Sequence, residues 1–556
     1  MLIAAIVIYG LIMGYQSILR YLTFKATAFD LGNMDQVLWN TIHGRLFQFT
    51  NQAIDWYGPP NRLGVHIEPI MLVVSLLYAV IADPRALLIF QTVVLAAGAP
   101  AVFLLTRRYF PAWPLLAVVM SAAYLVSPAL LGINIFDFHP DCLATPLLLY
   151  AILALSYRRY VTFLFLCFLV CTCKEDMPLA IALFGVLLIW KYRLPRLGLI
   201  LLLGGALWAV VAFKIVLPHF YGGVLANNFW YRYRFLGATP LGAIKNILTH
   251  PLILFTEVIT IGRVYYVFSL LRSTGFLALL APEWLLPALP KLLSNFLSSN
   301  QPNYSGIYHY NAAIIPFVIL ATLHGMRRFT LFWQGWSREQ ITQDEQALLM
   351  GKPAPDTEVG PYPTTWLPER LKTWSSRIWI PPVRLFKRLQ PRFMRLTLPK
   401  WRHARWQRLS ERMYPLTRKI STLRLQWFFC IWIIYMMGLN YLIAVPQLNS
   451  FWATHTPGLR EQQIQQLLDM IPPDASVSAS DDLNPHVSER QLLAVFPSIC
   501  LDSTCDRVVD YIIVDLDDIT FANKANAVSD INELAQGQYL ILKQAGDVIL
   551  LQRRST

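Results

Sequence analysis

The chain opens with an apolar segment, Met1 to Leu19, whose sequence is MLIAAIVIYGLIMGYQSIL. A helix of about 20 apolar residues spans the hydrocarbon core of a bilayer, so this segment predicts a membrane-spanning helix. Its position is that of a signal peptide, but no cleavage site of the Ala-x-Ala kind follows it. We therefore expect an uncleaved first span.

Similar apolar runs continue along the chain and set its class. Of the 556 residues, 55% are hydrophobic and only 14% are charged, whereas about 25% of the residues in a soluble domain are charged. The composition predicts a polytopic α-helical protein of the plasma (inner) membrane, with roughly 11 to 12 membrane helices. A further apolar segment, 67–82, is short for a span. The predicted spans are 1–20, 86–106, 113–133, 141–156, 159–173, 177–191, 197–217, 263–281, 283–298, 309–327 and 426–446.

Basic residues orient these spans, because loops rich in Lys and Arg stay in the cytoplasm. Three turns of this kind are Arg107-Arg108, Arg158-Arg159 and the group from Lys191 to Arg196. The loops between these turns are therefore expected outside the cytoplasm. Residues 20–66 lie on the same side of the membrane as those loops only if 67–82 does not cross it. We therefore expect a re-entrant or interfacial helix at 67–82.

The charge pattern also divides the chain into parts. Residues 1–327 form the predicted transmembrane domain, with an extracytoplasmic loop at about 21–66, and residues 328–425 form a basic cytoplasmic loop. Residues 327–424 contain twenty Lys and Arg against seven Asp and Glu. Basic residues mixed with Trp and Phe beside a span favour an anionic membrane surface over nucleic acid, which we do not expect as a partner. A Pro- and Gly-rich stretch at 351–365 predicts disorder.

After the last predicted span, 426–446, the charge balance reverses. Residues 447–556 contain fifteen Asp and Glu against seven Lys and Arg, and no run long enough to cross a membrane. Because they follow a cytoplasmic loop and one crossing, we expect a small extracytoplasmic α/β domain. Cys500 and Cys505 predict a disulfide in such an oxidising compartment. The predicted elements are a helix at 459–470, strands at 475–479 and 511–514, and a hairpin at 539–551 around Ala545-Gly546-Asp547.

Two carboxylates follow the first span closely, in the sequence Phe29-Asp-Leu-Gly-Asn-Met-Asp-Gln36. Ionisable groups at the end of a membrane span are energetically unfavourable, so those that are present are often functional. Asp30 and Asp35 are five positions apart, so on a helix they point in different directions and only one is expected in a given site. The simpler alternative is that one of them caps the helix predicted at 34–43.

Two more ionisable residues, His66 and Glu68, precede a proline at the start of the short apolar segment. Imidazole and carboxylate groups at this spacing suit either metal ligation or the binding of an anionic substrate. A single His-x-Glu pair is a weak signal, because a hydrogen-bonded pair at the membrane surface has the same sequence.

Three further groups fall on the same predicted face of the membrane. Asp137, His139 and Asp141 lie within five positions between two spans, where packing does not explain them. Lys174-Glu175-Asp176 separates two apolar helices, and His309-Tyr310 begins a later one. Charges in such places usually pair or line a pathway, so a local ion pair and a functional site are both open for the Lys174 group.

Several of these motifs together resemble a bacterial membrane-protein family catalogued as domain of unknown function 2079. The similarity covers nearly the whole chain except residues 330–425. The motifs that carry it are Phe29 to Asn40 with Gly44, Val65 to Pro69, Phe136 to Pro140, Lys174 to Asp176, Pro282 to Pro287, Ile471 to Val477 and Asn484 to Arg490.

The layout of that family resembles the C-type glycosyltransferase (GT-C) superfamily. The resemblance implies a first span, then a large extracytoplasmic loop with an acidic residue near its start, and a soluble domain after the last span. It also implies an inverting transfer of a sugar from a polyprenyl phosphate in the membrane to a lipid, glycan or protein acceptor. Asp30 matches the catalytic loop carboxylate, although Leu31 stands where many members have glutamate, so the base is either Asp30 or Asp35.

The chemistry of such a transfer suggests roles for the remaining groups on this face, because a leaving lipid phosphate is stabilised by positive charge or by a metal. Lys174 would lie near the lipid phosphate, with His66 and His139 as further donors. Glu68, Asp137 and Glu175 would orient substrate groups or hold a metal, while Asp176, His309 and Tyr310 complete the predicted substrate-binding residues. Whether a divalent metal ion takes part stays open, and its candidate ligands are His66, Glu68, Asp137 and His139.

A membrane transporter or lipid flippase is the alternative of a different class. In that case the Lys174 group would line a pathway through the bundle, and broken helices would hold the substrate near the midplane. The charged motifs are instead predicted at one membrane face, and the spans show no internal repeat. A structural or sensory protein whose outer domain binds a partner is a third hypothesis.

Overall fold

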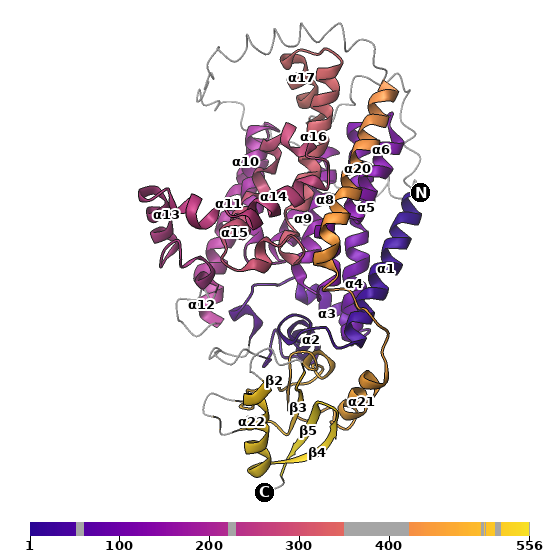
Figure 1. The fold of residues 1–556 in the computed structure, drawn as a ribbon. Coiled ribbons are helices and arrows are strands. Elements are labelled where there is room, and N and C mark those ends of the chain that lie inside the picture. Colours follow the sequence, from indigo (N-terminus) through magenta and orange to yellow (C-terminus); the bar gives the residue numbers. More distant parts are fainter. Residues whose placement is uncertain are drawn as a thin grey trace.

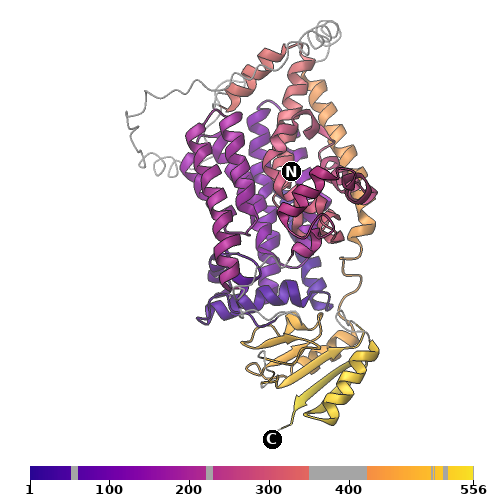
Figure 2. The ribbon, with the colours of Figure 1, turned by 90° about the vertical axis from the view of Figure 1, so that its left-hand side faces the viewer.

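In the computed structural model, the chain folds into a helical bundle with a small sheet domain at one end (Figure 1). The view turned by 90° also places the sheet domain beneath the bundle (Figure 2). The structure describes residues 1–51, 61–220, 229–349, 422–501, 505, 507–517 and 524–554. The stretch 351–365, for which the sequence predicts disorder, and most of the basic loop lie outside the described residues.

Many helices of the bundle start at a proline, which fits the first turn because that turn has no partner for a backbone N–H group. In α4 the preceding Asp83 also accepts a hydrogen bond from the backbone N–H of Arg85 at 2.7 Å. The bundle contains α1 (Leu2–Leu22), α2 (Asn33–Ile42), α3 (Met71–Tyr78), α4 (Pro84–Ala96), α5 (Gly98–Tyr109), α6 (Pro114–Leu125), α7 (Pro128–Ile135), α8 (Ala144–Ser156), α9 (Tyr160–Cys171), α10 (Met177–Trp190), α11 (Pro195–Val211), α12 (Leu217–Phe220), α13 (Pro240–Thr249), α14 (Ile261–Arg272), α15 (Leu289–Leu297), α16 (Ile315–Trp333), α17 (Arg338–Leu349) and α20 (Thr422–Leu448).

Among the described residues, four helical stretches are long and apolar enough to cross a membrane, and a pair bent by 45° makes a fifth if it is one span. Three shorter apolar helices accompany them. The segment 67–82 contains only the eight-residue α3, which is about 12 Å long against roughly 30 Å of hydrocarbon. It therefore does not cross as a helix, in agreement with the prediction. The five stretches are Leu2–Leu22, Pro84–Tyr109, Pro195–Phe220, Arg424–Ala444 and the pair Pro114–Leu125 with Pro128–Ile135.

The chain departs from the predicted spans at 263–281 and 283–298. Helix α14 ends at Arg272, and two 3₁₀ segments, Leu277–Leu280 and Pro282–Ala288, follow before α15. Proline has no N–H group to continue a helical ladder, and Pro282, Pro287 and Pro290 fall in this stretch. The two segments are apolar enough to be predicted as spans, but in the structure they form a series of short helices and not two continuous ones.

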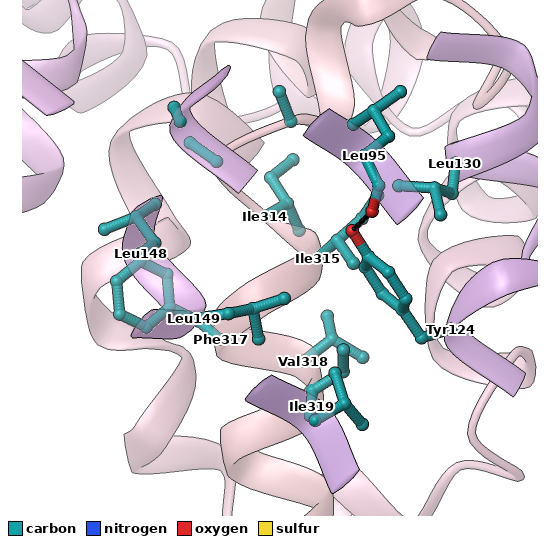
Figure 3. Close-up of a cluster of buried hydrophobic side chains, with 14 of the residues drawn as sticks. Leu95, Tyr124, Leu130, Leu148, Leu149, Ile314, Ile315, Phe317, Val318 and Ile319 are labelled. Atoms are coloured by element: carbon teal, nitrogen blue, oxygen red, sulfur yellow. Dashed lines mark hydrogen bonds between the residues drawn. The ribbon is translucent and has the colours of Figure 1, made fainter. Parts of the chain in front are cut away.

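Close packing of small residues and buried side chains holds the helices together, since lipid gives apolar side chains no reason to leave it. A Cβ atom added to Gly185 of α10 would lie 2.5 Å from the carbonyl oxygen of Gly198 in α11. In Figure 3, the hydroxyl of Tyr124 in α6 donates to the carbonyl of Leu95 in α4 at 2.7 Å. The same view shows α16 contributing Ile315, Phe317, Val318 and Ile319 to the buried cluster, together with Ile314 just before the helix.

The C-terminal domain is a five-stranded sheet of order β2-β1-β3-β5-β4, with β1 parallel to β2 and β3 and the remaining pairs antiparallel. Helix α21 packs on one face and α22 on the other. The predicted helix, strands and hairpin are present, and Cys500 and Cys505 form the predicted disulfide. Strand β2 and helix α22 were not predicted. The elements are α21 (Leu459–Leu468), β1 (Val477–Ala479), β2 (Leu493–Val495), β3 (Tyr511–Asp515), α22 (Lys524–Gln536), β4 (Tyr539–Ala545) and β5 (Val548–Arg553).

Helices α2 and α3 lie at the end of the bundle that carries the sheet domain, whereas α17 lies at the opposite end (Figure 1). Phe24, which follows α1, belongs to the same apolar cluster as Ile464 of α21 and Leu550 of β5. The first loop of the bundle therefore shares a core with the C-terminal domain.

Candidate active site

Asp30 lies in a short π-helix, Ala28–Gly32, that leads directly into α2. Such π-helical turns are rare and often mark functional positions. One carboxylate oxygen of Asp30, Oδ1, is 2.9 Å from Nε2 of His139, and the other accepts a hydrogen bond from Thr27 Oγ1 at 2.8 Å. The Asp30 side chain keeps 25% of its surface exposed. It is therefore a fixed carboxylate that is still partly open to its surroundings.

Thr27 also connects Asp30 to Asp137. Its backbone N–H and its hydroxyl lie 2.8 and 3.0 Å from Oδ2 of Asp137. Arg20, at the end of α1, places its Nε 3.5 Å from the other Asp137 oxygen. Burial raises the pKa of Asp137 and Arg20 opposes that shift. Asp137 thus anchors the segment that carries Asp30, and its own carboxylate is occupied by these partners.

His139 is a cation in this arrangement. Its Nδ1 lies 2.8 Å from the carbonyl oxygen of Asp137, which can only accept, and its Nε2 faces the Asp30 carboxylate. Both ring nitrogens therefore act as donors. Burial lowers the pKa of His139, but the hydrogen bond to Asp30 outweighs burial and leaves the pKa above its usual value. For Asp30, burial acts upward, and the bond to His139 brings the pKa below its usual value.

Replacing His139 with glutamine removes its ion pair with Asp30, which we expect to stabilise the protein over only part of the pH range. The pair contributes above the depressed Asp30 pKa, and its contribution falls as pH rises from about 6.5 through the raised His139 pKa. We expect His139→Gln to lower the free energy of unfolding by about 2 kcal/mol near pH 5, and by less at alkaline pH. Unfolding measured from pH 4 to 9 tests this, and a difference independent of pH would contradict it.

The contacts continue from His139 to Lys174. The rings of His139 and His309 stack with centroids 3.8 Å apart and planes 15° apart. Nε2 of His309 is 4.0 Å from Oδ2 of Asp141, and Nζ of Lys174 is 3.4 Å from the same oxygen. Burial lowers the pKa of His309, and the neighbouring cation His139 lowers it further. A neutral ring thus stacks on a charged one.

Glu175 and Asp176 join the first loop and a later helix to this cluster. Nδ1 of His66 lies 2.9 Å from Glu175 Oε1, while Glu175 Oε2 accepts from the backbone N–H of Ile67 at 3.1 Å. Nζ of Lys291, in α15, lies 2.6 Å from Asp176. Burial lowers the pKa of His66 and Lys174 adds to that shift, which favours the neutral imidazole.

Glu68 and Tyr310 occupy the edges of the cluster. The Glu68 carboxylate pairs with Nε of Arg62 at 2.9 Å, and both side chains are buried. The ring of Tyr310 lies 4.1 Å from that of His309 and 5.8 Å from Nζ of Lys291, measured to the ring centroid. With Tyr310, the predicted site residues other than Asp35 and Glu68 lie in one network of contacts, and the charge of Glu68 acts on Lys174 and His66.

Asp35 lies in a different environment. It is fully buried, and it accepts hydrogen bonds of 2.6 Å from the hydroxyls of Tyr78 and Ser488. Burial raises the pKa of Asp35 well above its usual range, and the nearby Glu489 adds to the shift. Neither predicted carboxylate caps α2, because the capping position is Gly32. Asp35 thus belongs to the contact between α2, α3 and the C-terminal domain.

The four candidate metal ligands do not form a shared coordination site. The carboxylate of Glu68 is taken by Arg62, and that of Asp137 by Arg20 and Thr27. Within the described part of the chain, no group of three or more His, Cys, Asp or Glu is placed to hold a metal ion. We therefore derive no chemical step through a metal here.

Arg232 is a cation beside the cluster that the motifs did not reveal. Its guanidinium carbon lies 4.6 Å from the ring centroid of Phe229, and Phe229 stacks on His66 at 5.0 Å. It also interacts with Tyr310, and Nη1 lies 3.5 Å from Asn303 Oδ1. Among the described residues, no carboxylate pairs with it. The run Trp230-Tyr-Arg-Tyr-Arg234 was the available sequence signal.

Two crystal structures of ArnT from Cupriavidus metallidurans are similar to the chain. The apo structure has 12% identity and a TM-score of 0.43, over 99% of this chain and 97% of that one. The structure bound to undecaprenyl phosphate has 11% identity and a TM-score of 0.45, over 100% and 98%. No curated protein matches the chain.

The family comparison covers most of the sequence. The family described as "Predicted membrane protein (DUF2079)" matches residues 20–344 and 404–550. These ranges include every residue of the charged cluster and all of the C-terminal sheet except the end of β5, which continues to Arg553. The chain therefore belongs to the DUF2079 family of membrane proteins.

Proposed function

We propose that the protein is a membrane glycosyltransferase that moves a sugar from a polyprenyl-phosphate donor to an acceptor hydroxyl, with Asp30 as the general base. The observation that carries the proposal is the contrast between the two carboxylates of the first loop. Asp30 is partly exposed, ionised and joined to the charged cluster, whereas Asp35 is fully buried. A reacting carboxylate must reach its substrate within hydrogen-bond distance, and only Asp30 meets this condition.

The proposed reaction is a single displacement with inversion. The oxygen of the acceptor hydroxyl forms a bond to the anomeric carbon while the bond from that carbon to the phosphate oxygen breaks. The electron pair of the broken bond stays on the lipid phosphate, and the hydroxyl proton passes to Asp30. Because hydrogen bonds hold Asp30 ionised, it accepts the proton late, when attack on the anomeric carbon has made the hydroxyl acidic.

Arg232 is the better candidate for binding the donor phosphate than Lys174. Lys174 is buried and already engaged with Asp141, so a phosphate would have to break that pair. Arg232 is only partly buried and carries a planar set of donors suited to phosphate oxygens. Positive charge at this point would stabilise the leaving phosphate as the bond breaks.

Replacing Arg232 with glutamine is expected to weaken binding of undecaprenyl phosphate. Hydrogen bonds to a charged group contribute about 1.5–3 kcal/mol, so the dissociation constant should rise roughly 10- to 100-fold. Arg234, exposed two residues later, provides the matched control Arg234→Gln, which should bind as the wild type does. Equal affinity of both variants, measured by titration of the purified protein, would contradict this role.

The orientation of the protein is also part of the proposal. Basic turns on the side away from the cluster and the disulfide Cys500–Cys505 both favour an extracytoplasmic C-terminal domain, since disulfides persist in oxidising compartments. The charged cluster would then face the same side. An impermeant thiol reagent applied to intact cells should label Gly546→Cys, and labelling only after lysis would reverse the orientation.

The experiment that tests the function uses the purified protein in proteoliposomes. Labelled undecaprenyl-phosphate hexoses are supplied as donors, and an extract of cell-envelope lipids and glycans as acceptor. Release of undecaprenyl phosphate together with labelled product of inverted anomeric configuration is the expected result. An intact donor that only changes leaflet would identify a flippase instead, and no turnover of any donor would reject the proposal.

A further inference from the structure

The π-helix that carries Asp30 is in direct contact with the C-terminal domain. The backbone N–H of Ala28 donates to Oδ1 of Asp481 at 2.8 Å, and the carbonyl of Ala28 accepts from Nδ2 of Asn51 at 2.9 Å. Both polar groups of this residue's backbone thus have a partner outside the π-helix, and the carbonyl also accepts the backbone N–H of Asn33 at the end of the π-helix. Asp30 is only two residues further along the chain.

A pair of buried amides extends this contact into the sheet. Asn51 and Asn484 exchange two hydrogen bonds, of 2.7 and 2.8 Å, and both side chains are fully buried. Nδ2 of Asn484 also lies 3.2 Å from the carbonyl of Ala494 in β2. The amide pair therefore links Ala28 to an edge strand of the C-terminal sheet.

The contact is close enough to exclude a side chain at Gly32. A Cβ atom added there would lie 2.5 Å from Oδ1 of Asn484 and 3.2 Å from Nδ2 of Asn51. Gly32 has an ordinary helical φ of −60°, so space, and not backbone conformation, requires glycine at this position.

Further hydrogen bonds fasten the first loop to β2 and to the turn before it. The backbone N–H of Leu493 lies 2.8 Å from Oγ1 of Thr50, and the same hydroxyl lies 2.8 Å from the Leu493 carbonyl. Nε2 of Gln36 faces the carbonyls of Arg490 and Gln491 at 3.3 and 3.2 Å. Loop and domain thus meet along a hydrogen-bonded seam, defined here as Ala28, Gly32, Gln36, Thr50 and Asn51 against Asp481, Asn484, Arg490, Gln491 and Leu493.

A five-residue π-helix has little stability of its own, because a short helix gains few hydrogen bonds for the dihedral angles it fixes. Its position depends on outside partners, which are Thr27 with Asp137 on the bundle side and the seam on the other. Asp481 and Asn484 follow β1, at the carboxyl end of parallel strands, where α/β sheets commonly bind ligands. In this protein the chain's own first loop occupies that place.

We propose that Asp481 and Asn484 are positioning residues for the base, so that the C-terminal domain completes the active site. This inference rests on the proposed function. Misplacement of a reacting group by about 1 Å can cost roughly 100-fold in rate. Donor binding should be little affected, because Arg232 and its neighbours take no part in the seam. Loss of the seam should therefore appear in kcat and not in KM.

The test compares variants of the full-length protein in the donor-release assay. Asn484→Ala and Gly32→Ala are expected to lower kcat by about 10- to 100-fold and to leave KM for the undecaprenyl-phosphate hexose within a factor of about three. Asp481→Ala should behave in the same way, whereas Asp481→Asn keeps an acceptor oxygen for Ala28 and should restore most of kcat. Gln544→Ala, which removes an exposed amide of β4, is the control and should match the wild type.

Hydrogen exchange gives a second readout that needs no turnover. Amides in residues 27–36 should exchange faster in Asn484→Ala than in the wild type, while the unfolding temperature stays near that of Gln544→Ala. If the wild type turns over donor and Asn484→Ala keeps the wild-type kcat, the positioning role is overturned although the proposed function stands. If the wild type turns over no donor, the proposed function fails, and unchanged exchange in Asn484→Ala would overturn the seam as well.

Discussion

Replacing Asp30 with asparagine is expected to lower the rate of sugar transfer by about 10³-fold, since general bases typically contribute 10²- to 10⁴-fold. Asparagine has nearly the same shape and can still accept from Thr27, so the π-helix should keep its place. It cannot accept the acceptor's proton, and it leaves His139 without an anionic partner. The measurement is release of undecaprenyl phosphate from a labelled donor by membranes that contain equal amounts of each protein.

The matched control for this prediction is Asp35→Asn. Burial raises the pKa of Asp35, which favours the neutral carboxyl over the carboxylate and reduces the difference from an amide. An amide can accept from Tyr78 and donate to the hydroxyl oxygen of Ser488, whose own hydrogen can go to the Pro485 carbonyl 2.9 Å away. Transfer by this variant should stay within about threefold of the wild type. Full activity of Asp30→Asn with loss in Asp35→Asn would reverse the assignment.

Replacing Lys174 with methionine is expected to lower the free energy of unfolding by about 3–5 kcal/mol, which is the usual cost of leaving one member of a buried ion pair alone. Asp141 is 1% exposed, and its Oδ1 has no hydrogen-bond partner among the described residues. Methionine fills much of the space of lysine without its charge. The unfolding of the purified protein in detergent micelles, followed by denaturant titration, measures the loss.

A double variant separates this structural role from phosphate binding. Lys174→Met combined with Asp141→Asn removes both charges, and it should recover most of the lost stability because no unpaired charge remains. Binding of undecaprenyl phosphate by the double variant should stay close to that of the wild type. A stable single variant with strongly weakened lipid binding would instead make Lys174 the phosphate ligand that the sequence analysis predicts.

The sequence located the charged cluster because its members interrupt apolar runs. Lys174-Glu175-Asp176 between two apolar helices, and Asp137 with His139 after another, are conspicuous by composition alone. Charge bias in the turns then placed these motifs on one face, and the structure brings them into contact. The C-terminal hairpin of β4 and β5 was also predictable, because alternating and β-branched residues flank the Ala545-Gly546-Asp547 turn.

Partnership between distant segments could not be predicted in the same way. Asp30 and Asp35 look alike in sequence, and only the location of Ser488, 453 residues from Asp35, shows that Asp35 belongs to a domain contact. Arg232 lies in an aromatic and basic run, and nothing in that run distinguishes it from Arg234. Only the stacking of Phe229 on His66 shows that Arg232 lies beside the cluster. The helices at 263–298 were misjudged because hydropathy counts apolar residues and ignores what proline does to a helical ladder.

The hydrogen bond from Ala28 to Asp481 also limits how early during synthesis the first loop can reach its final arrangement. Its two residues are 453 positions apart, and ribosomes add about 5–20 residues per second, so roughly 20–90 seconds separate their appearance. Throughout that interval the first loop lacks its partner in the C-terminal domain. On the proposed function, a nascent chain therefore stays inactive until its last domain has folded against the first loop, and a truncated product without this domain is expected not to transfer sugar.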